Sequence, residues 1–178
     1  MDNLQRRQQE FLELLKPIQR KLESFCLNMT RDREEARDLM QDTIVVLWQH
    51  LDTLRDRSAF RSYAYTVATN TFKRRYTRSK FFGLLTEEHH ETLASRDHSP
   101  EQITDHSILH DALRELPHRS REALVLFEIA DMSIAEIQKI QGGTISSIKV
   151  RLMRARRMLQ HRLGVSPNTQ EQQTIGVQ

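Results

Sequence analysis

The stretch SIAEIQKIQGGTISSIKVRLMRARRML, residues 133–159, decides the fold of the second half of the chain. Ser133, with Glu136 three residues later, has the pattern of a capping box, in which two side chains satisfy the first backbone N–H groups of a helix. Gly142 and Gly143 predict the end of that short helix, because glycine adopts a left-handed backbone without steric cost. Thr144 then predicts the N-cap of a longer helix. This order of elements is typical of a helix-turn-helix.

The longer helix has an apolar face and a basic face. Its predicted buried residues are Ile145, Ile148, Leu152, Ala155 and Leu159, and its outward or flanking residues are Ser146, Ser147, Lys149, Val150, Met153, Arg154 and Arg157. Small polar side chains lead and arginines follow, which suits a recognition helix whose first turn enters the DNA major groove. An ordinary amphipathic bundle helix buries the same residues. The glycine turn and the concentration of arginine favour the recognition helix.

Two more helices are predicted before this motif. The first is capped by Ser107 and ends at Pro117, and the second carries Ala123, Leu124, Phe127 and Ala130. Residues 107–164 are therefore expected to form one small helical domain, followed by a disordered tail over residues 165–178.

A flexible linker is predicted over residues 81–106, where helical periodicity is lost and Glu, Asp, His, Ser and Pro gather. Three histidines in this segment, His89, His90 and His98, have no cysteine among them and match no zinc-ligand spacing. No metal site is therefore expected.

The first half, residues 1–80, shows apolar residues at three- and four-residue steps, which predicts a second small helical domain. Pro17 interrupts the first stripe and predicts a new helix with this proline in its first turn. Asp32 predicts the N-cap of the next helix. The outward face of that helix carries Glu34, Asp38, Gln41, Asp42, Val45 and Gln49. It is either a solvated surface or a contact for a basic partner, and the apolar Val45 among acids favours the contact.

The last helix of this half is predicted to start at a Ser58 cap and to bury Phe60, Tyr63, Ala64, Val67 and Thr71. Beyond Phe72 the same stripe becomes basic, with Arg74, Arg75 and Arg78, and Lys73 and Lys80 lie beside it. A solvated tail has a similar composition. The aromatic side chains Tyr63, Tyr65, Phe72 and Tyr76 are interleaved with these cations, however, and aromatics can stack on unpaired bases. We therefore expect this helix to bind nucleic acid.

Composition agrees with an all-α chain of two small helical domains. Hydrophobic residues make up 38% of the 178 residues, charged residues 29%, and there are only 5 glycines. The net charge is only +3, but the clustered cations predict local basic surfaces. The single cysteine, Cys26, lies on an apolar stripe and is expected to be buried. No apolar run approaches the roughly 18 residues of a membrane helix, so neither membrane insertion nor export is expected.

Two stretches resemble the extracytoplasmic-function sigma factors of the sigma-70 family. Residues 36–48, ARDLMQDTIVVLW, and 51–75, LDTLRDRSAFRSYAYTVATNTFKRR, resemble the sigma-two domain. Residues 113–159, which begin LRELPHRSREALVLFEIADM, resemble the sigma-four domain. The family pattern differs at several positions: Tyr63 stands where tryptophan is frequent, and Gln138 and Gln141 where small or apolar residues usually pack.

The resemblance implies a bacterial, cytoplasmic transcription initiation factor that is not an enzyme and needs no cofactor. Its implied partners are core RNA polymerase, through the beta-prime coiled coil and the beta flap, promoter DNA and an anti-sigma factor. The implied polymerase-binding residues are Asp38, Leu39, Gln41, Asp42 and Val45. The implied minus-ten contacts, which handle a flipped base, are Leu54, Arg55, Tyr63, Asn70, Lys73, Arg74 and Arg75. The implied minus-thirty-five contacts are Thr144, Ser146, Ser147, Lys149, Val150, Arg151, Arg154 and Arg157.

Two other classes of protein remain as alternatives. A stand-alone helix-turn-helix regulator would use the first half for dimerisation or sensing, and it would bind duplex operator DNA without polymerase. An enzyme acting on nucleic acid is disfavoured, because the sequence has no carboxylate cluster, nucleophile elbow, phosphate-binding glycine loop or metal motif.

Overall fold

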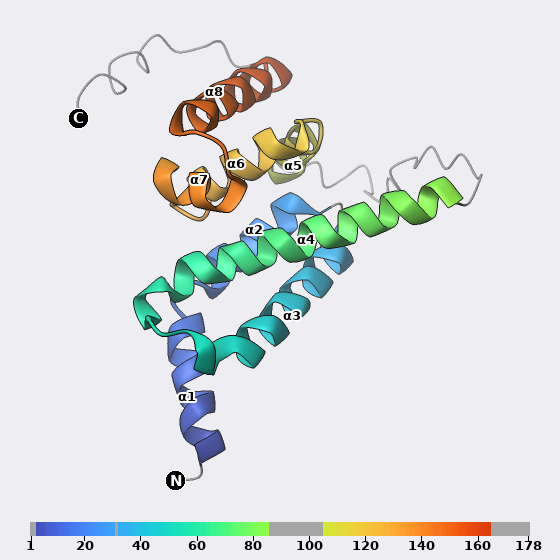
Figure 1. Cartoon of the computed structure of the whole chain (residues 1–178). Helices are drawn as coiled ribbons and strands as arrows, with labels where there is room; N and C mark the ends of the chain where they lie inside the picture. Colours follow the sequence, from blue (N-terminus) through green and yellow to red (C-terminus); the bar gives the residue numbers. More distant parts are fainter. Residues whose placement is uncertain (1–2, 31, 86–104, 165–178) are drawn as a thin grey trace.

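The structure is a computed structural model that describes residues 3–30, 32–85 and 105–164. In these ranges every regular element is a helix, as the sequence predicts (Figure 1). The first half contains α1 (Asn3–Leu15), α2 (Gln19–Met29), α3 (Arg33–His50), the short 3-10 helices η1 (Leu51–Thr53) and η2 (Arg57–Ala59), and α4 (Phe60–Leu85). The second half contains α5 (Asp105–Arg114), α6 (His118–Glu128), α7 (Ile134–Gln141) and α8 (Ile145–Arg162).

The core of the first half lies where α2, α3 and α4 pack against one another. Leu22, Leu39 and Leu47 are fully buried there, and the ring of Phe25 meets the edge of the Tyr65 ring at a centroid distance of 5.5 Å. Phe11 joins α1 to this core through edge contacts with Trp48 and Phe60. Apolar burial of this kind, at roughly 25 cal/mol per Å², is the main force that holds the three helices together.

The helix boundaries confirm some predicted caps and correct others. Asp32 caps α3 as predicted, because its carboxylate accepts a hydrogen bond of 2.8 Å from the Glu35 backbone N–H. Pro17 lies in the turn between α1 and α2 and not in the first turn of α2. Ser58 is not an N-cap. It lies inside η2, where the Asp56 carboxylate accepts its backbone N–H, and α4 begins two residues later.

In the second half, α6 packs against α8, and α7 contacts both of them. The predicted capping box is present at Ser133 with Glu136, and Thr144, predicted as an N-cap, forms a second capping box with Ser147. Gly142 and Gly143 have φ of 72° and 91°, the left-handed region that disfavours other residues. A Cβ on Gly143 would also lie 2.8 Å from the Ser147 hydroxyl oxygen.

Three predictions about the helices need correction. Ile145, predicted to be buried, is 41% exposed at the first position of α8, whereas Ile148 one turn later is fully buried. Ser107 is not an N-cap, since α5 already begins at Asp105. Helix α4 continues to Leu85, so helix replaces the first residues of the predicted linker. The expected linker histidines and the expected tail over residues 165–178 lie outside the described residues.

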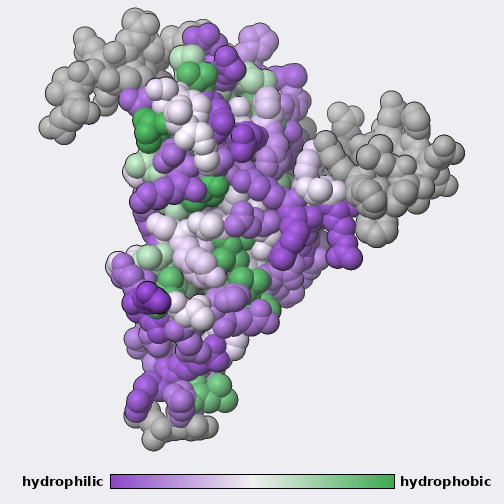
Figure 2. Space-filling view, viewed as in Figure 1, coloured by the Kyte–Doolittle hydropathy of each residue, from purple (hydrophilic) through white to green (hydrophobic). Residues whose placement is uncertain are grey.

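The two halves are in direct contact. The second half lies against α2 and α4 of the first, and α2 touches both α5 and α6 (Figure 1). His110 Nε2 lies 2.8 Å from the Leu27 carbonyl oxygen, and Lys21 forms an ion pair with Asp131. Hydrophilic residues cover most of the face in Figure 2, with apolar residues in small separate areas. Among the described helices none is long and apolar enough to cross a membrane.

Cys26 provides a test of the first core. It is fully buried, and this burial, helped by the charge of Glu23, raises the pKa of its thiol to about 12. We expect a thiol-alkylating reagent to leave the native chain unmodified at neutral pH and to label it in urea, because the thiolate is the reactive form. The readout is mass spectrometry. Ser146→Cys, at an exposed position, is the control that should add one native label. Native labelling of Cys26 at the rate of that control would contradict the packing.

Candidate nucleic-acid interface

The outward face of α3 carries the predicted acidic surface. Asp38, Gln41 and Asp42 are exposed, and Val45 beside them is 52% exposed. Leu39 differs, because its side chain is 0% exposed and belongs to the core. Each helical residue turns about 100°, so position 39 lies about 100° around α3 from Asp38, at the side of the acidic surface where the helix meets the core. Leu39 therefore supports this surface from beneath and does not present a side chain on it.

Arg75 of α4 lies on this acidic surface, although the sequence reading assigned it to DNA. Its Nη2 and Nε atoms lie 2.5 and 3.0 Å from Oδ2 of Asp42, and Nη2 also donates to the Asp38 carbonyl at 3.2 Å. The sequence separates Arg75 from Asp42 by 33 residues, so only the packing of α3 against α4 brings them together. A ligand at either residue must compete with this exposed ion pair.

A groove of about 1000 Å³ runs between α3 and α4. Four predicted minus-ten residues line it together: Tyr63, Asn70, Lys73 and Arg74. The other lining residues, which were not predicted to contact nucleic acid, are Val46, Gln49, His50, Thr66, Val67, Thr71 and Thr77. The groove combines an aromatic ring, amide and hydroxyl groups and cations. These are the groups that stack on, hydrogen-bond to and neutralise an unpaired nucleotide.

The loop between η1 and η2 lies near the start of α4. Arg55 is exposed and Leu54 half-buried at its tip. Arg57 holds this loop, because its Nη1 donates to the carbonyls of Leu51 and Leu54 at 2.6 and 2.5 Å. Its Nε pairs with Glu10 of α1 at 2.6 Å. Arg57 is thus a structural residue of the loop, which its sequence position alone did not reveal.

Helix α8 presents an exposed row made of Ser146, Lys149, Val150, Arg154 and Arg157. Among the described residues, no acidic partner contacts the three cations of this row, so their charge faces solvent. Two predicted contacts, Thr144 and Ser147, are engaged in the capping box. A single oxygen of Ser147 accepts from Thr144 N–H and donates to the Thr144 carbonyl. A nucleic acid that bound Thr144 and Ser147 would contact side chains that also cap α8.

Gln141 joins three helices, although it departs from the expected apolar residue. It is 5% exposed, and its Nε2 donates to the Arg119 carbonyl of α6 at 2.9 Å. Its Oε1 accepts from Nη1 of Arg151 on α8 at 3.0 Å. Arg151, a predicted phosphate contact, is therefore held against the turn of the motif. Gln138 has a smaller role and donates to the Gly143 carbonyl at 2.9 Å.

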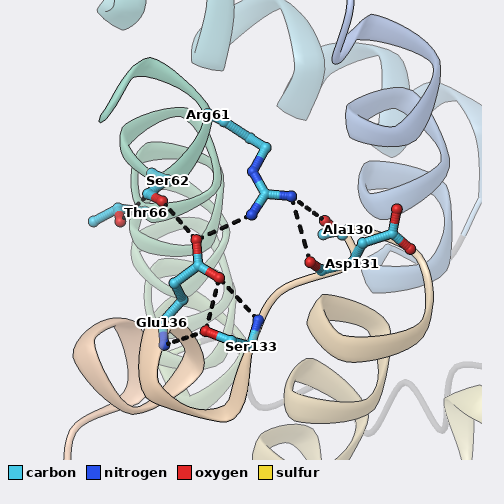
Figure 3. A network of polar contacts seen from close by, with 7 residues as sticks. All are labelled: Arg61, Ser62, Thr66, Ala130, Asp131, Ser133 and Glu136. Atoms are coloured by element: carbon cyan, nitrogen blue, oxygen red, sulfur yellow. Dashed lines mark hydrogen bonds and ion pairs between the residues drawn. The ribbon is translucent and has the colours of Figure 1, made fainter. Parts of the chain in front are cut away.

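Glu136 bonds to both halves of the chain (Figure 3). Its Oε2 accepts from the backbone N–H and hydroxyl of Ser133, both at 2.8 Å, and its Oε1 contacts Arg61 and Ser62 of α4. The backbone bond from Ser133 is the main cause that lowers the pKa of this carboxyl to about 2, with Arg61 and Ser62 contributing. Glu136 is therefore ionised at neutral pH, where it can serve both as a cap and as an ion-pair partner.

Glu122 of α6 is a fully buried carboxylate at the contact between the halves. Lys73 of α4 places its Nζ 3.2 Å from one carboxylate oxygen, and His118 Nδ1 lies 3.6 Å from the other. The His118 ring stacks on Phe72 at a centroid distance of 5.2 Å. Lys73 thus lines the α3–α4 groove and neutralises a charge of the second half. Tyr65, read from the sequence as a base-stacking residue, is instead 1% exposed in the core.

Removal of the Gln141 side chain tests its role in the motif. We expect Gln141→Ala to lower the free energy of unfolding by about 1–3 kcal/mol, because the part-buried Arg119 carbonyl loses the amide donor of Gln141 and Arg151 loses its acceptor. Urea denaturation followed by circular dichroism measures the change. Gln138→Ala, which removes one exposed hydrogen bond, is the matched control and should cost under about 1 kcal/mol. Equal losses in the two variants would contradict a special role for Gln141.

Comparison with known proteins agrees with this geometry. Residues 14–82 match the family model of Sigma-70 region 2, and residues 106–159 match that of Sigma-70, region 4. RNA polymerase sigma factor YlaC of Bacillus subtilis is 28% identical over 149 residues, which cover 81% of this chain and 86% of that protein. The ECF RNA polymerase sigma factor SigM of Bacillus subtilis is 29% identical, with 76% of this chain and 83% of that protein covered.

A solved structure is also similar. The sigma factor RpoE in complex with the anti-sigma factor NepR from Bartonella quintana superposes with a TM-score of 0.71 at 28% identity, and covers 89% of this chain and 97% of that one. Among the described residues no group of three or more His, Cys, Asp or Glu side chains is placed to hold a metal ion. With both family regions in order and the helix-turn-helix in place, the chain belongs to the extracytoplasmic-function sigma factors of the sigma-70 family, which direct RNA polymerase to promoters.

Proposed function

We propose that this sigma factor divides promoter recognition between its two halves, in the bacterial cytoplasm where core RNA polymerase works. Residues 1–80 dock on polymerase and open the minus-ten element, and residues 107–164 bind the minus-thirty-five element. The observation that carries this proposal is the α3–α4 groove, in which Tyr63, Asn70 and Arg74 lie together beside the acidic face of α3. A stand-alone regulator would have no use for such a groove beside its DNA-binding motif.

Polymerase docking is assigned to Asp38, Gln41, Asp42 and Val45. Their exposure on one face of α3 offers two carboxylates, an amide and an apolar side chain to a basic partner surface. The beta-prime coiled coil is the proposed partner of this face, and the beta flap the proposed partner of the second half. Docking displaces Arg75 from Asp42, at a cost of about 0–1 kcal/mol because the ion pair is exposed.

Promoter opening is assigned to the α3–α4 groove and to the loop that carries Leu54 and Arg55. A flipped base costs a few kcal/mol in lost stacking and pairing, and a pocket that receives it lets binding drive strand separation. Tyr63 offers a ring for stacking, Asn70 hydrogen bonds, and Arg74 a charge for the backbone. These steps make and break no covalent bond, so we propose no enzymatic activity and no cofactor for this chain.

Recognition of the minus-thirty-five element is assigned to α8. Ser146, Lys149 and Val150 lie in its exposed first turns, where the helix would meet base edges in the major groove. Arg151, Arg154 and Arg157 follow at the positions for phosphate contacts, with Thr144 and Ser147 at the helix terminus.

An anti-sigma factor is a further proposed partner. It is supported by the similarity to a sigma factor solved in complex with the anti-sigma factor NepR. Transcription in vitro with core polymerase on a randomised promoter pool tests the function as a whole. We expect one promoter class to be enriched. A chain that ignored core polymerase and bound duplex sites alone would instead be a helix-turn-helix regulator.

Charge reversal on α3 tests the docking surface. The variant Asp38→Lys/Asp42→Lys is expected to weaken binding to core polymerase at least tenfold and to leave the far-ultraviolet circular dichroism unchanged, because both positions are exposed. Affinity is measured by fluorescence anisotropy. The control is Glu128→Lys, which also breaks an exposed arginine–carboxylate pair, that of Arg156 and Glu128 at 2.7 Å. Unchanged affinity in the α3 variant would refute the docking assignment.

Arg154→Ala tests the phosphate contacts of α8. Each lost phosphate contact makes the plot of log K against log salt shallower by about 0.9, so we expect this change for promoter binding by the holoenzyme. Arg156→Ala, on the same helix but paired with Glu128, is the control and should retain the wild-type slope. A wild-type slope in Arg154→Ala would remove this residue from the phosphate contacts.

A further inference from the structure

One turn of α1 contacts both ends of the loop of residues 51–57, hereafter the minus-ten loop, which connects α3 to α4. Glu10 and Phe11 lie three and four residues after Arg7, so the three side chains share one face of the helix. We call these three residues the α1 brace. They precede residue 14, where the match to Sigma-70 region 2 begins, so the family match assigns them no role.

Arg7 holds the start of the minus-ten loop. Its Nη2 donates to the Trp48 carbonyl at 2.7 Å, and its Nε lies 3.1 Å from Oδ2 of Asp52. The guanidinium carbon also lies 4.3 Å from the centre of the Trp48 ring, in a cation–π contact. Trp48 belongs to the last turn of α3 and Asp52 to η1. One guanidinium of α1 therefore joins the end of α3 to the first residues of the loop.

Glu10 holds the other end of the loop through Arg57. Its Oε1 lies 2.6 Å from Arg57 Nε. The Nη1 atom of the same guanidinium donates to the carbonyl oxygens of Leu51 and Leu54 at 2.6 and 2.5 Å. A carboxylate that binds one side of a planar guanidinium also fixes the direction of its other N–H groups. Glu10 thus orients the donor that holds two backbone carbonyls of the minus-ten loop.

Phe11 anchors the residues on either side of the loop. Its ring is 6% exposed and makes edge contacts with the rings of Trp48 and Phe60, at centroid distances of 5.4 and 6.1 Å. Trp48 precedes the loop and Phe60 follows it. The buried ring therefore sets the separation of the two ends, and the polar contacts of Arg7 and Glu10 place the backbone between them.

The polar contacts of the α1 brace are suited to positioning more than to stabilising the fold. The side chains of Glu10, Arg57 and Asp52 are 40%, 37% and 65% exposed, and exposed ion pairs add little to global stability. A loop that is held in place before its ligand arrives, however, loses less conformational entropy when it binds. Loss of these contacts should therefore change DNA binding more than folding.

We propose that the α1 brace positions the minus-ten loop, and that Arg7 and Glu10 are positioning residues that set how strictly the loop selects a flipped base. This inference rests on the proposed function, because it takes the loop with Leu54 and Arg55 to receive that base. Selective contacts require binding groups within about 0.5 Å of their productive positions. A displaced loop therefore loses affinity for the preferred base and little affinity for the others.

Substitutions on one face of α1 test this role, because alanine is a good helix former and keeps α1 intact. Glu10→Ala releases Arg57, and Arg7→Ala releases Trp48 and Asp52. The matched control is Glu13→Ala, since Glu13 is exposed on the same helix and accepts a hydrogen bond from Gln9 of α1 itself.

The measurement uses holoenzyme assembled with the full-length chain. Fluorescence anisotropy gives its affinity for single-stranded oligonucleotides that carry the minus-ten sequence preferred in the randomised pool, or one of the three other bases at each position in turn. The readout is the selectivity ratio, the dissociation constant for the best-tolerated other base divided by that for the preferred base. Affinity for core polymerase is measured in parallel to show that each variant is folded.

We expect Glu10→Ala and Arg7→Ala to lower the selectivity ratio three- to tenfold at the most selective position, mainly through weaker binding of the preferred base. Affinity for core polymerase should stay at the wild-type value, and Glu13→Ala should retain the wild-type ratio. Glu10→Gln should fall between Glu10→Ala and the wild type, because its amide oxygen can still accept a hydrogen bond from Arg57.

Three results would overturn the positioning role. These are an unchanged ratio in both alanine variants, an equal loss of affinity for all four bases, which a merely structural role produces, and a fall in the Glu13→Ala control as large as in the brace variants. A wild-type holoenzyme that bound all four bases equally at every position would instead refute the proposed function of the loop. Selectivity in the wild type that persists in both alanine variants refutes the positioning role alone.

Discussion

The position of the helix-turn-helix depends on the carboxylate of Glu136. Its two oxygens receive four contacts, two from Ser133 at the start of α7 and two from Arg61 and Ser62 on α4. The same charge therefore begins a helix and fixes the second half against the first. Charge-assisted hydrogen bonds are about twice as strong as neutral ones. The Glu136 carboxylate therefore stabilises both the first turn of α7 and the contact between α7 and α4. The helix-turn-helix, which is the proposed reader of the minus-thirty-five element, is thus linked directly to α4, which lines the groove.

At two places, charged residues that are proposed to bind polymerase or DNA are paired with opposite charges within the chain. Arg75 bonds Asp42 on the acidic face of α3, and Lys73 pairs with Glu122 at the contact between the halves. The first pair is exposed and exchanges for a partner at small cost. The second includes a buried carboxylate, whose separation from its cation is costly until water or another cation reaches it. The two pairs therefore differ in how readily a partner displaces them.

Local sequence signals were good guides where the physics is local. Asp32, Ser133 and Thr144 cap their helices as predicted, because a cap needs only a side-chain oxygen and an N–H a few residues away. Prediction failed where a neighbour decides the outcome. Asp56 displaced Ser58 as a cap, Tyr65 entered the core against Phe25, and Leu39 turned away from the surface on which the family pattern placed it. Gln141 is buried because Arg119 and Arg151 satisfy its amide, and neither partner is adjacent in sequence.

The sequence by itself determined the helical class, the helix-turn-helix with its glycine turn, and the residue types of the acidic face, the basic end of α4 and the recognition helix. These depend on periodicity and on contacts within a few residues along the chain. Only the tertiary structure decided which of these residues face one another. The pairing of Arg75 with Asp42 and the contact of Arg61 with Glu136 join residues 33 and 75 positions apart, and the groove brings together residues of α3 and α4. Such contacts follow from how whole helices pack, because packing depends on the summed fit of many side chains and not on any one segment.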